Sequence, residues 1–135
     1  MNDTTTIERI NNALDRCRVA PGFRVGMFFS TYENMKIVYD AIVKENSVIN
    51  SSNAEIKLRD GNRFEVRFDN GSYLSAFVLN GNCIGQRWHT LMVDNSIREI
   101  YVKEILRCSI FPYIDKNSGC QSLNPKPVYF NVQEV

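Results

Sequence analysis

The chain has 135 residues, 44% of them hydrophobic and 23% charged, which suits one ordinary globular domain with a buried core. Its 16 basic and 15 acidic side chains leave a formal net charge of +1, which argues against a strongly basic nucleic-acid binder and against an acidic mimic of DNA. No apolar run approaches the roughly 20 residues that span a bilayer, and the polar N-terminus lacks a signal-peptide layout, so we expect an intracellular protein.

Residues 5–18 predict an amphipathic helix at the start of the chain. Thr5 and Glu8 form a capping box, in which the hydroxyl accepts from a first-turn amide and the glutamate reaches back. The apolar stripe that follows has helical spacing and consists of Ile7, Ile10, Leu14 and Cys17. Pro21-Gly22 then breaks the helix.

The next two elements are predicted as a strand and a long helix. Residues 24–29 are an apolar run, which is typical of a strand buried on both faces of a sheet. Ser30 and Glu33 form a second capping box, and the helix that follows extends to about Asn46. Its polar residues lie on one narrow face, so we expect the rest of the domain to cover most of it.

The hydrophobic period changes to two after residue 53, which predicts antiparallel strands. Residues 55–58 and 63–68 form a hairpin around the turn Asp60-Gly61. Asn70-Gly71 is a second strong hairpin turn, and residues 73–79 form the strand that follows it.

A second buried strand is predicted at residues 90–93, directly before Asp94. Ser96 and Glu99 form a third capping box, which starts a helix that reaches about residue 107. The prolines and glycine beyond it predict an irregular tail, with residues 128–132 as a candidate edge strand.

This order of elements predicts an α/β fold. Two buried strands separated by a helix and antiparallel strands indicate a single domain with a mostly parallel central sheet, flanking helices and a β-hairpin excursion. Within residues 1–135 we assign 1–22 to the N-terminal helix, 23–114 to the core and 115–135 to the irregular tail.

Four residues around the second buried strand are the first candidates for a binding site. We place Arg87, Trp88, Asp94 and Asn95 at the edge of the sheet where ligands bind in open α/β folds. A guanidinium and an indole at this edge suit a base, a phosphate or a protein partner. The alternatives are a Trp88 ring packed in the core, and an Asp94 that caps the helix start beside Ser96 rather than holding a metal ion.

Three arginines of the predicted hairpin are candidates for nucleic-acid contact. Arg59, Arg63 and Arg67 can form a basic ribbon along this hairpin, but Glu65 lies among them and reduces the positive charge. A solvated strand face is the alternative. We expect no metal site and no cofactor, because the single histidine and the wide spacing of the cysteines do not match a metal-binding pattern; the cysteines are Cys17, Cys83, Cys108 and Cys120.

Three segments, taken together, resemble the ATPase core of phage terminase large subunits. They are Met27-Phe28-Phe29-Ser30-Thr31-Tyr32-Glu33-Asn34, Phe68-Asp69-Asn70-Gly71-Ser72-Tyr73-Leu74, and Gly85-Gln86-Arg87 through Val93-Asp94. The resemblance covers about residues 23–114. It implies a P-loop-type fold in which Asp94 is the Walker B aspartate, the residue that holds magnesium in this family.

The chain also departs from this family pattern. No G-x-x-x-x-G-K-[ST] loop occurs in it, whereas the family's Walker A loop precedes the helix with which this chain begins. Asn95 stands where the family carries a glutamate that activates water, and an amide cannot accept that proton at neutral pH. The family's nuclease domain has no counterpart here either, so we expect a truncated, degenerate relative that is not an enzyme.

The sequence therefore favours a non-catalytic, phage-encoded binding protein on a terminase-like ATPase scaffold. It would act by protein–protein contact on part of the nucleic-acid machinery, for example as an inhibitor of a CRISPR-type host defence or of a replication complex. The alternative is a DNA-packaging or DNA-transaction accessory that binds nucleotide or DNA. A small enzyme with an unrecognised site is a third hypothesis.

Overall fold

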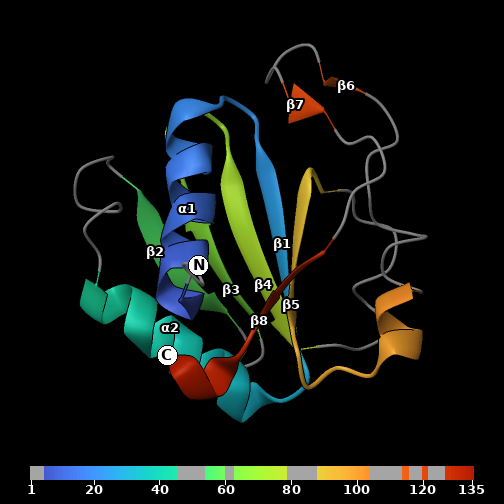
Figure 1. Cartoon of the computed structure of the whole chain (residues 1–135). Coiled ribbons are helices and arrows are strands. Elements are labelled where there is room, and N and C mark those ends of the chain that lie inside the picture. The colour runs from blue at the N-terminus through green and yellow to red at the C-terminus, as the bar shows by residue number, and fades with distance from the viewer. Residues whose placement is uncertain are drawn as a thin grey trace.

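The centre of the molecule is a six-stranded sheet in the order β2-β3-β4-β1-β5-β8 (Figure 1). The structure is a computed structural model, and it describes residues 5–45, 54–59, 63–78, 88–103, 114–115, 120–121 and 127–135. The parallel strands are β4 (Tyr73–Val78), β1 (Arg24–Phe29), β5 (Thr90–Asp94) and β8 (Val128–Phe130). The hairpin strands β2 (Glu55–Arg59) and β3 (Arg63–Arg67) continue the sheet, with β3 antiparallel to both of its neighbours. The predicted α/β class, with its mostly parallel sheet and hairpin excursion, is confirmed.

Helices α1 (Thr6–Val19) and α2 (Tyr32–Glu45) both lie on one face of this sheet (Figure 1). One apolar cluster joins them to the side chains that this face presents, and in β1 these are Val25, Met27 and Phe29. The helices contribute Ile10, Leu14, Cys17, Met35, Val38 and Ile42. We call this side of the sheet the helix-covered face. None of the described helices is long and apolar enough to cross a membrane.

The caps of the two helices follow the predicted chemistry with one correction. Thr5 caps α1 as expected, because its hydroxyl accepts from the Glu8 amide at 3.2 Å. The cap of α2 is Thr31, whose hydroxyl accepts from the Asn34 amide at 3.2 Å, and not the predicted Ser30. The Ser30 side chain is turned instead toward the end of β5.

The opposite face of the sheet carries a second, smaller cluster. It contains Phe28, Phe77, Trp88, Leu91, Val93, Ile97 and Val102, with Tyr73 packed against it. β1 thus supplies alternate side chains to both clusters, which confirms the prediction of a strand buried on both faces. Residues 99–103, which are helical, bring Val102 to this second cluster.

The turn at Asn70-Gly71 fixes the end of α1 as well as the hairpin between β3 and β4. Gly71 has φ of +86°, a backbone conformation that glycine adopts without strain. The Asn70 side-chain amide donates to the carbonyls of Cys17 and Arg18 at 2.9 and 3.1 Å, and the Ser72 hydroxyl also donates to the Cys17 carbonyl. These donors satisfy carbonyl groups that the last turn of a helix leaves unpaired.

The C-terminal segment belongs to the sheet, which corrects the prediction of an irregular tail for residues 127–135. β8 is the expected edge strand, and a short 3-10 helix, η2 (Val132–Glu134), follows it. The Thr6 hydroxyl donates to the Asn131 carbonyl at 3.0 Å, and Arg9 donates to the Tyr129 carbonyl. The start of α1 therefore covers part of this sheet edge. Two further short strands, β6 (Ile114–Asp115) and β7 (Cys120–Gln121), form a separate antiparallel pair.

Candidate functional site

Asp94 lies at the C-terminal end of β5 and is almost fully buried, with 1% of its surface exposed. Its Oδ2 accepts from the Asn34 side-chain amide at 2.9 Å and from the Ser30 backbone amide at 3.3 Å. Its Oδ1 accepts from the backbone amide and the hydroxyl of Ser96 at 3.0 and 2.8 Å. The donors come from the loop after β1, from α2 and from the turn after β5, so the carboxylate joins three segments.

The Ser30 hydroxyl completes this group, which we call the Asp94 cluster (Ser30, Asn34, Asp94 and Ser96). Ser30 Oγ lies 3.2 Å from Asp94 Oδ2 and 2.6 Å from Ser96 Oγ. Both hydroxyls lie within hydrogen-bond distance of Asp94 and of each other, and either one can donate in the short contact between them. Burial raises the pKa of Asp94, but hydrogen bonds from Ser96, Asn34 and the Ser30 amide outweigh it and hold that pKa below its ordinary value.

The Asp94 cluster does not fit the magnesium ion that the resemblance implies. The described residues around this position offer a single carboxylate, and both of its oxygens already accept hydrogen bonds from amide and hydroxyl groups of the chain. In the part of the chain that the structure describes, no three histidine, cysteine, aspartate or glutamate side chains gather where they could hold a metal ion. Asp94 therefore acts as the expected turn cap beside Ser96 and as a tie between strands.

Trp88 lies at the other end of β5, which corrects the prediction that it shares an edge with Asp94. It precedes the strand, so six residues of extended chain, about 20 Å, separate the two positions. Trp88 is 0% exposed, and its ring contacts Phe28, Phe77 and Tyr73 edge-on. Its Nε1 finds no hydrogen-bond partner among the described residues. The alternative of a core tryptophan is the one that the structure supports.

The three predicted site residues that the structure describes are therefore not all brought together. Trp88 is buried at the start of β5, Asp94 is buried at its end, and Arg87 lies outside the described residues. Asn95 has an exposed side chain, and its backbone amide donates to the Phe130 carbonyl at 2.9 Å, which ties it to β8.

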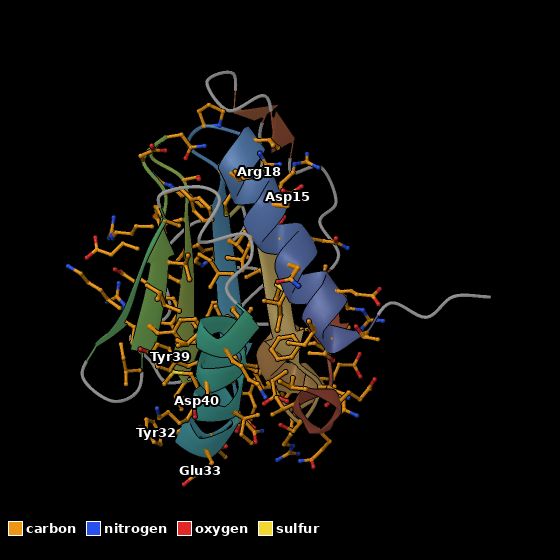
Figure 2. All side chains as sticks on the ribbon, turned by 90° about the vertical axis from the view of Figure 1, so that its left-hand side faces the viewer. Asp15, Arg18, Tyr32, Glu33, Tyr39 and Asp40 are labelled. Atoms are coloured by element: carbon orange, nitrogen blue, oxygen red, sulfur yellow. The ribbon has the colours of Figure 1, made fainter. Side chains whose placement is uncertain are left out.

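Two of the hairpin arginines, Arg63 and Arg67, lie on the face of the sheet opposite the helices. The register places Arg63 beside Phe77 and Arg67 beside Tyr73, and their guanidinium carbons lie 5.1 and 5.3 Å from the ring centroids. Arg24 of β1 lies 5.7 Å from the same Tyr73 ring. We call this group, Arg24, Arg63, Arg67 and Tyr73, the arginine face. Strands β2 and β3 carry nitrogen-tipped side chains on the side away from α1 (Figure 2).

Glu65 holds the arginine face in place, and it is not the solvated residue that the alternative assumed. It is 2% exposed and accepts from Arg63 Nη2 at 2.8 Å and from Arg67 Nε at 3.1 Å. The arginine side chains remain 39% and 54% exposed. Arg59 occupies the register position opposite Arg63, and its side chain lies outside the described residues.

Comparisons with known proteins give a fold but no sequence family. No protein-family model and no curated protein sequence matches the chain significantly. The structure matches the large terminase of a thermophilic bacteriophage in complex with ADP, with a TM-score of 0.54 and 14% identity over 95% of this chain. A second crystal form of that terminase gives 0.52 and 15% over 93% of this chain. The chain has a phage terminase ATPase-like fold.

The likeness covers only part of the terminase chains. The chain spans 30% and 29% of the length of these two terminase structures. The large terminase ATPase domain of Thermus phage P74-26 also matches, with a TM-score of 0.47 and 13% identity, over 93% of this chain and 70% of that one.

The sequence alone did not predict which residues contact each other in the Asp94 cluster or in the arginine face. Ser30 and Asn34 follow β1, which is parallel and adjacent to β5, and the carboxyl ends of parallel neighbours meet at one edge. That rule could have brought both residues to Asp94. The contact of Arg67 with Tyr73 could have been found from the Asn70-Gly71 turn, because the turn length fixes which residues lie opposite each other.

Proposed function

We propose that this protein is a non-catalytic binding protein on a terminase-like ATPase fold, and that it acts by contact with another protein. The observation that carries the proposal is the Asp94 cluster, in which the chain's own donors occupy both carboxylate oxygens. A carboxylate used in this way holds strands together and is not available to a metal-bound nucleotide. The next residue, Asn95, supplies an amide that cannot act as a general base.

The arginine face is the surface that we assign to the partner. Arginine and tyrosine are enriched at protein interfaces, because both combine apolar area with hydrogen-bond donors. Here the guanidinium groups are already positioned by Glu65 and by Tyr73, so little side-chain freedom remains to be lost on binding. The Arg63–Glu65–Arg67 group carries two positive charges and one negative charge, which favours a partner with a moderately acidic surface.

A partner from the nucleic-acid machinery fits this proposal. Proteins that bind DNA or RNA often expose acidic regions away from their basic clefts, and a small phage-encoded protein that covers such a region would act as an inhibitor. Inhibition of a host defence complex or of a replication complex is the role that we propose for it.

The proposal that the protein is not a catalyst is tested by adding nucleotide. We expect neither ATP with magnesium nor ADP with magnesium to raise the melting temperature of the full chain, because a ligand stabilises only a protein that binds it. We also expect phosphate release from ATP at the rate of a buffer blank. A rise in melting temperature, or a release rate that Asp94→Asn abolishes and Asp69→Asn does not, would overturn this part. Asp69 is an exposed turn residue and is the matched control for the loss of one carboxylate.

The binding surface is tested with charge reversals. Wild-type protein, Arg67→Glu and Lys44→Glu are immobilised in equal amounts and exposed to an extract of the phage host. Lys44 is an exposed lysine near the end of α2, so its reversal changes the net charge equally without touching the arginine face. We expect a partner that wild type and Lys44→Glu retain and Arg67→Glu loses. Equal capture by all three proteins would exclude this surface.

Nucleic-acid binding is the second candidate, and one observation favours it. Two guanidinium groups lie against the Tyr73 ring, which gives flat, cationic groups of the kind on which unpaired bases stack. The test is fluorescence anisotropy of a labelled single-stranded oligonucleotide at low and moderate salt. Binding that weakens with salt and with Arg67→Glu would support this candidate over the protein partner.

A further inference from the structure

Strand β2 is the outermost strand on the hairpin side of the sheet (Figure 1). Among the described residues, only β3 pairs with it. Its sequence is Glu55-Ile56-Lys57-Leu58-Arg59, which alternates charged and apolar residues and runs from a negative to a positive end. We call the outer side of this strand the β2 edge. Its charge changes from acidic to basic along the strand.

The hydrogen-bond pattern shows which residues present their backbone groups at the β2 edge. The Phe68 amide donates to the Ser72 carbonyl at 3.0 Å, and the Tyr73 amide donates to Phe23 on the other side of β4. In an antiparallel pair, directly bonded positions alternate with unbonded ones. Arg67 and Tyr73 are thus an unbonded pair, and the backbone groups of Arg67 point toward β2.

The same alternation extends into β2. Glu65 precedes Arg67 by two positions, so its backbone groups also point toward β2, where Lys57 is its partner. The backbone groups of Lys57 are therefore used within the sheet. Those of its two neighbours, Ile56 and Leu58, point outward at the β2 edge.

We propose that a second copy of this chain adds to the β2 edge as an antiparallel strand centred on Lys57. In this register Ile56 lies opposite Leu58 of the second copy, and both have their backbone groups pointing into the contact. The two pairs related by the two-fold axis then form four backbone hydrogen bonds. The result is one continuous sheet through both copies.

Charge complementarity supports a second copy of this chain as the partner of the β2 edge. The register sets Glu55 opposite Arg59 of the second copy, and the symmetry repeats this pair. Within one chain Arg59 lies opposite Arg63, a like-charge pair, so Glu55 of the second copy supplies an acidic neighbour on the other side of this position. On the other face of the strand, Leu58 is 38% exposed and would be covered by Ile56 of the second copy.

The central lysine is the unfavourable element of this contact. Lysine in an edge strand usually discourages pairing with another strand, and here Lys57 would meet its own counterpart on the axis. Glu55 Oε1 lies 3.2 Å from Lys57 Nζ in each chain, so each ammonium group keeps a carboxylate beside it and the repulsion is offset. The contact involves one short strand from each copy, so we expect a weak dimer.

The dimer would also change the arginine face. An antiparallel pair centred on a two-fold axis that runs perpendicular to the sheet keeps the same side of both sheets on the same side of the assembly. The two arginine faces would then form one surface, with twice the area offered to a partner.

The test is the self-association of the full chain, measured by sedimentation equilibrium from micromolar to millimolar concentration. We expect wild type and the exposed control Lys44→Glu to dimerise equally. Glu55→Arg and Arg59→Glu should each raise the dimer Kd about tenfold, because symmetry turns two attractive pairs into two repulsive ones. The double variant Glu55→Arg with Arg59→Glu should dimerise like wild type.

A mixing experiment makes the test independent of effects on folding. In an equimolar mixture of Glu55→Arg and Arg59→Glu, both arginines of the first variant lie opposite glutamates of the second, so the mixture should form a heterodimer about as tight as the wild-type dimer. Recovery is therefore expected both in the mixture and in the double variant, where both pairs are opposite in charge again. A mixture that associates no more strongly than either variant alone would contradict this register. A wild type that stays monomeric at millimolar concentration overturns the proposal. Single variants that associate like wild type, or a double variant as weak as the single ones, overturn it as well.

Discussion

The two faces of the central sheet are built from the same strands but have different compositions. The helix-covered face packs one large apolar cluster against α1 and α2. The opposite face has an aromatic cluster around Trp88 and, beyond it on β3, arginines held by the buried Glu65. Folding alone explains the composition of the first face, whereas the second face combines a folding core with an exposed, positioned set of cations.

The largest expected loss of stability tests whether the aromatic cluster around Trp88 contributes to folding as strongly as the apolar cluster of the helix-covered face. Trp88→Ala should lower the free energy of unfolding by about 3–5 kcal/mol, the usual cost of removing a buried aromatic side chain. Phe29→Ala, which truncates a fully buried ring on the helix-covered face, should cost about the same. Urea denaturation followed by far-UV circular dichroism measures both, because Trp88 is the only tryptophan and its fluorescence would be lost. A loss below about 1 kcal/mol for Trp88→Ala would make the second cluster a surface feature.

The fit between Trp88 and β1 provides an internal check on this prediction. A side-chain carbon at Gly26 would lie 2.8 Å from the Trp88 ring, so Gly26→Ala should destabilise the wild type by about 1–3 kcal/mol. In the Trp88→Ala background the same substitution should cost much less, because the ring is gone. Equal costs in both backgrounds would show that the ring does not lie over Gly26.

The next effect concerns the tie at the end of β5. Asp94→Asn should lower the free energy of unfolding by about 2–3 kcal/mol, because it removes the charge that strengthens these hydrogen bonds and turns an amide donor toward donors. Asp69→Asn, at an exposed turn, should change it by less than about 0.5 kcal/mol. Urea denaturation at neutral pH measures both. Equal values would mean that Asp94 is not a structural tie.

A smaller loss of stability is expected at Glu65, in the polar part of the second face. Glu65→Gln should cost about 1–2 kcal/mol, because the buried group keeps one acceptor oxygen for two half-exposed arginines. The comparison is Asp15→Asn on the outer side of α1, where the salt bridge with Arg18 is exposed (Figure 2) and should be worth less than about 0.5 kcal/mol. Thermal or urea denaturation of both variants gives the difference. A Glu65→Gln protein as stable as wild type would remove the distinction between these two ion pairs.

The smallest effect is a pH dependence of the Asp94 tie. The pKa of Asp94 is lower in the folded protein than its ordinary value of 3.8, so its contribution to stability is complete above that pH and is lost as the pH falls below it. The difference in unfolding free energy between wild type and Asp94→Asn should therefore narrow from pH 7 to about pH 3. A difference that widens on acidification would contradict the lowered pKa.

Much of the fold follows from local sequence patterns. The change of hydrophobic period after residue 53 separates the helical part from the hairpin strands, and the two runs at 24–29 and 90–93 are apolar because both faces of their strands are covered. The cap of α2 was harder to predict, since Ser30 and Thr31 both carry a hydroxyl. Only the position of Asp94 on a neighbouring strand decides between them.

The site was less predictable, because it depends on strand direction and on packing. Trp88 and Asp94 are close in sequence, but they flank one strand and so lie at its opposite ends. The space for the Trp88 ring is provided by Gly26, a residue far earlier in the chain that no local pattern connects with it. From the sequence, Glu65 is a charge that reduces a basic surface. Its burial depends on the two strands that flank β3, and these cannot be identified from the sequence around Glu65.

The Asn70-Gly71 turn has a consequence for how this chain can change in length. The same few side chains close a hairpin and fasten the last carbonyls of a helix that lies more than 50 positions away in sequence. Adding or removing one residue there would shift a strand and release the helix end together. Relatives of this protein should therefore vary in length at other loops and keep this corner constant.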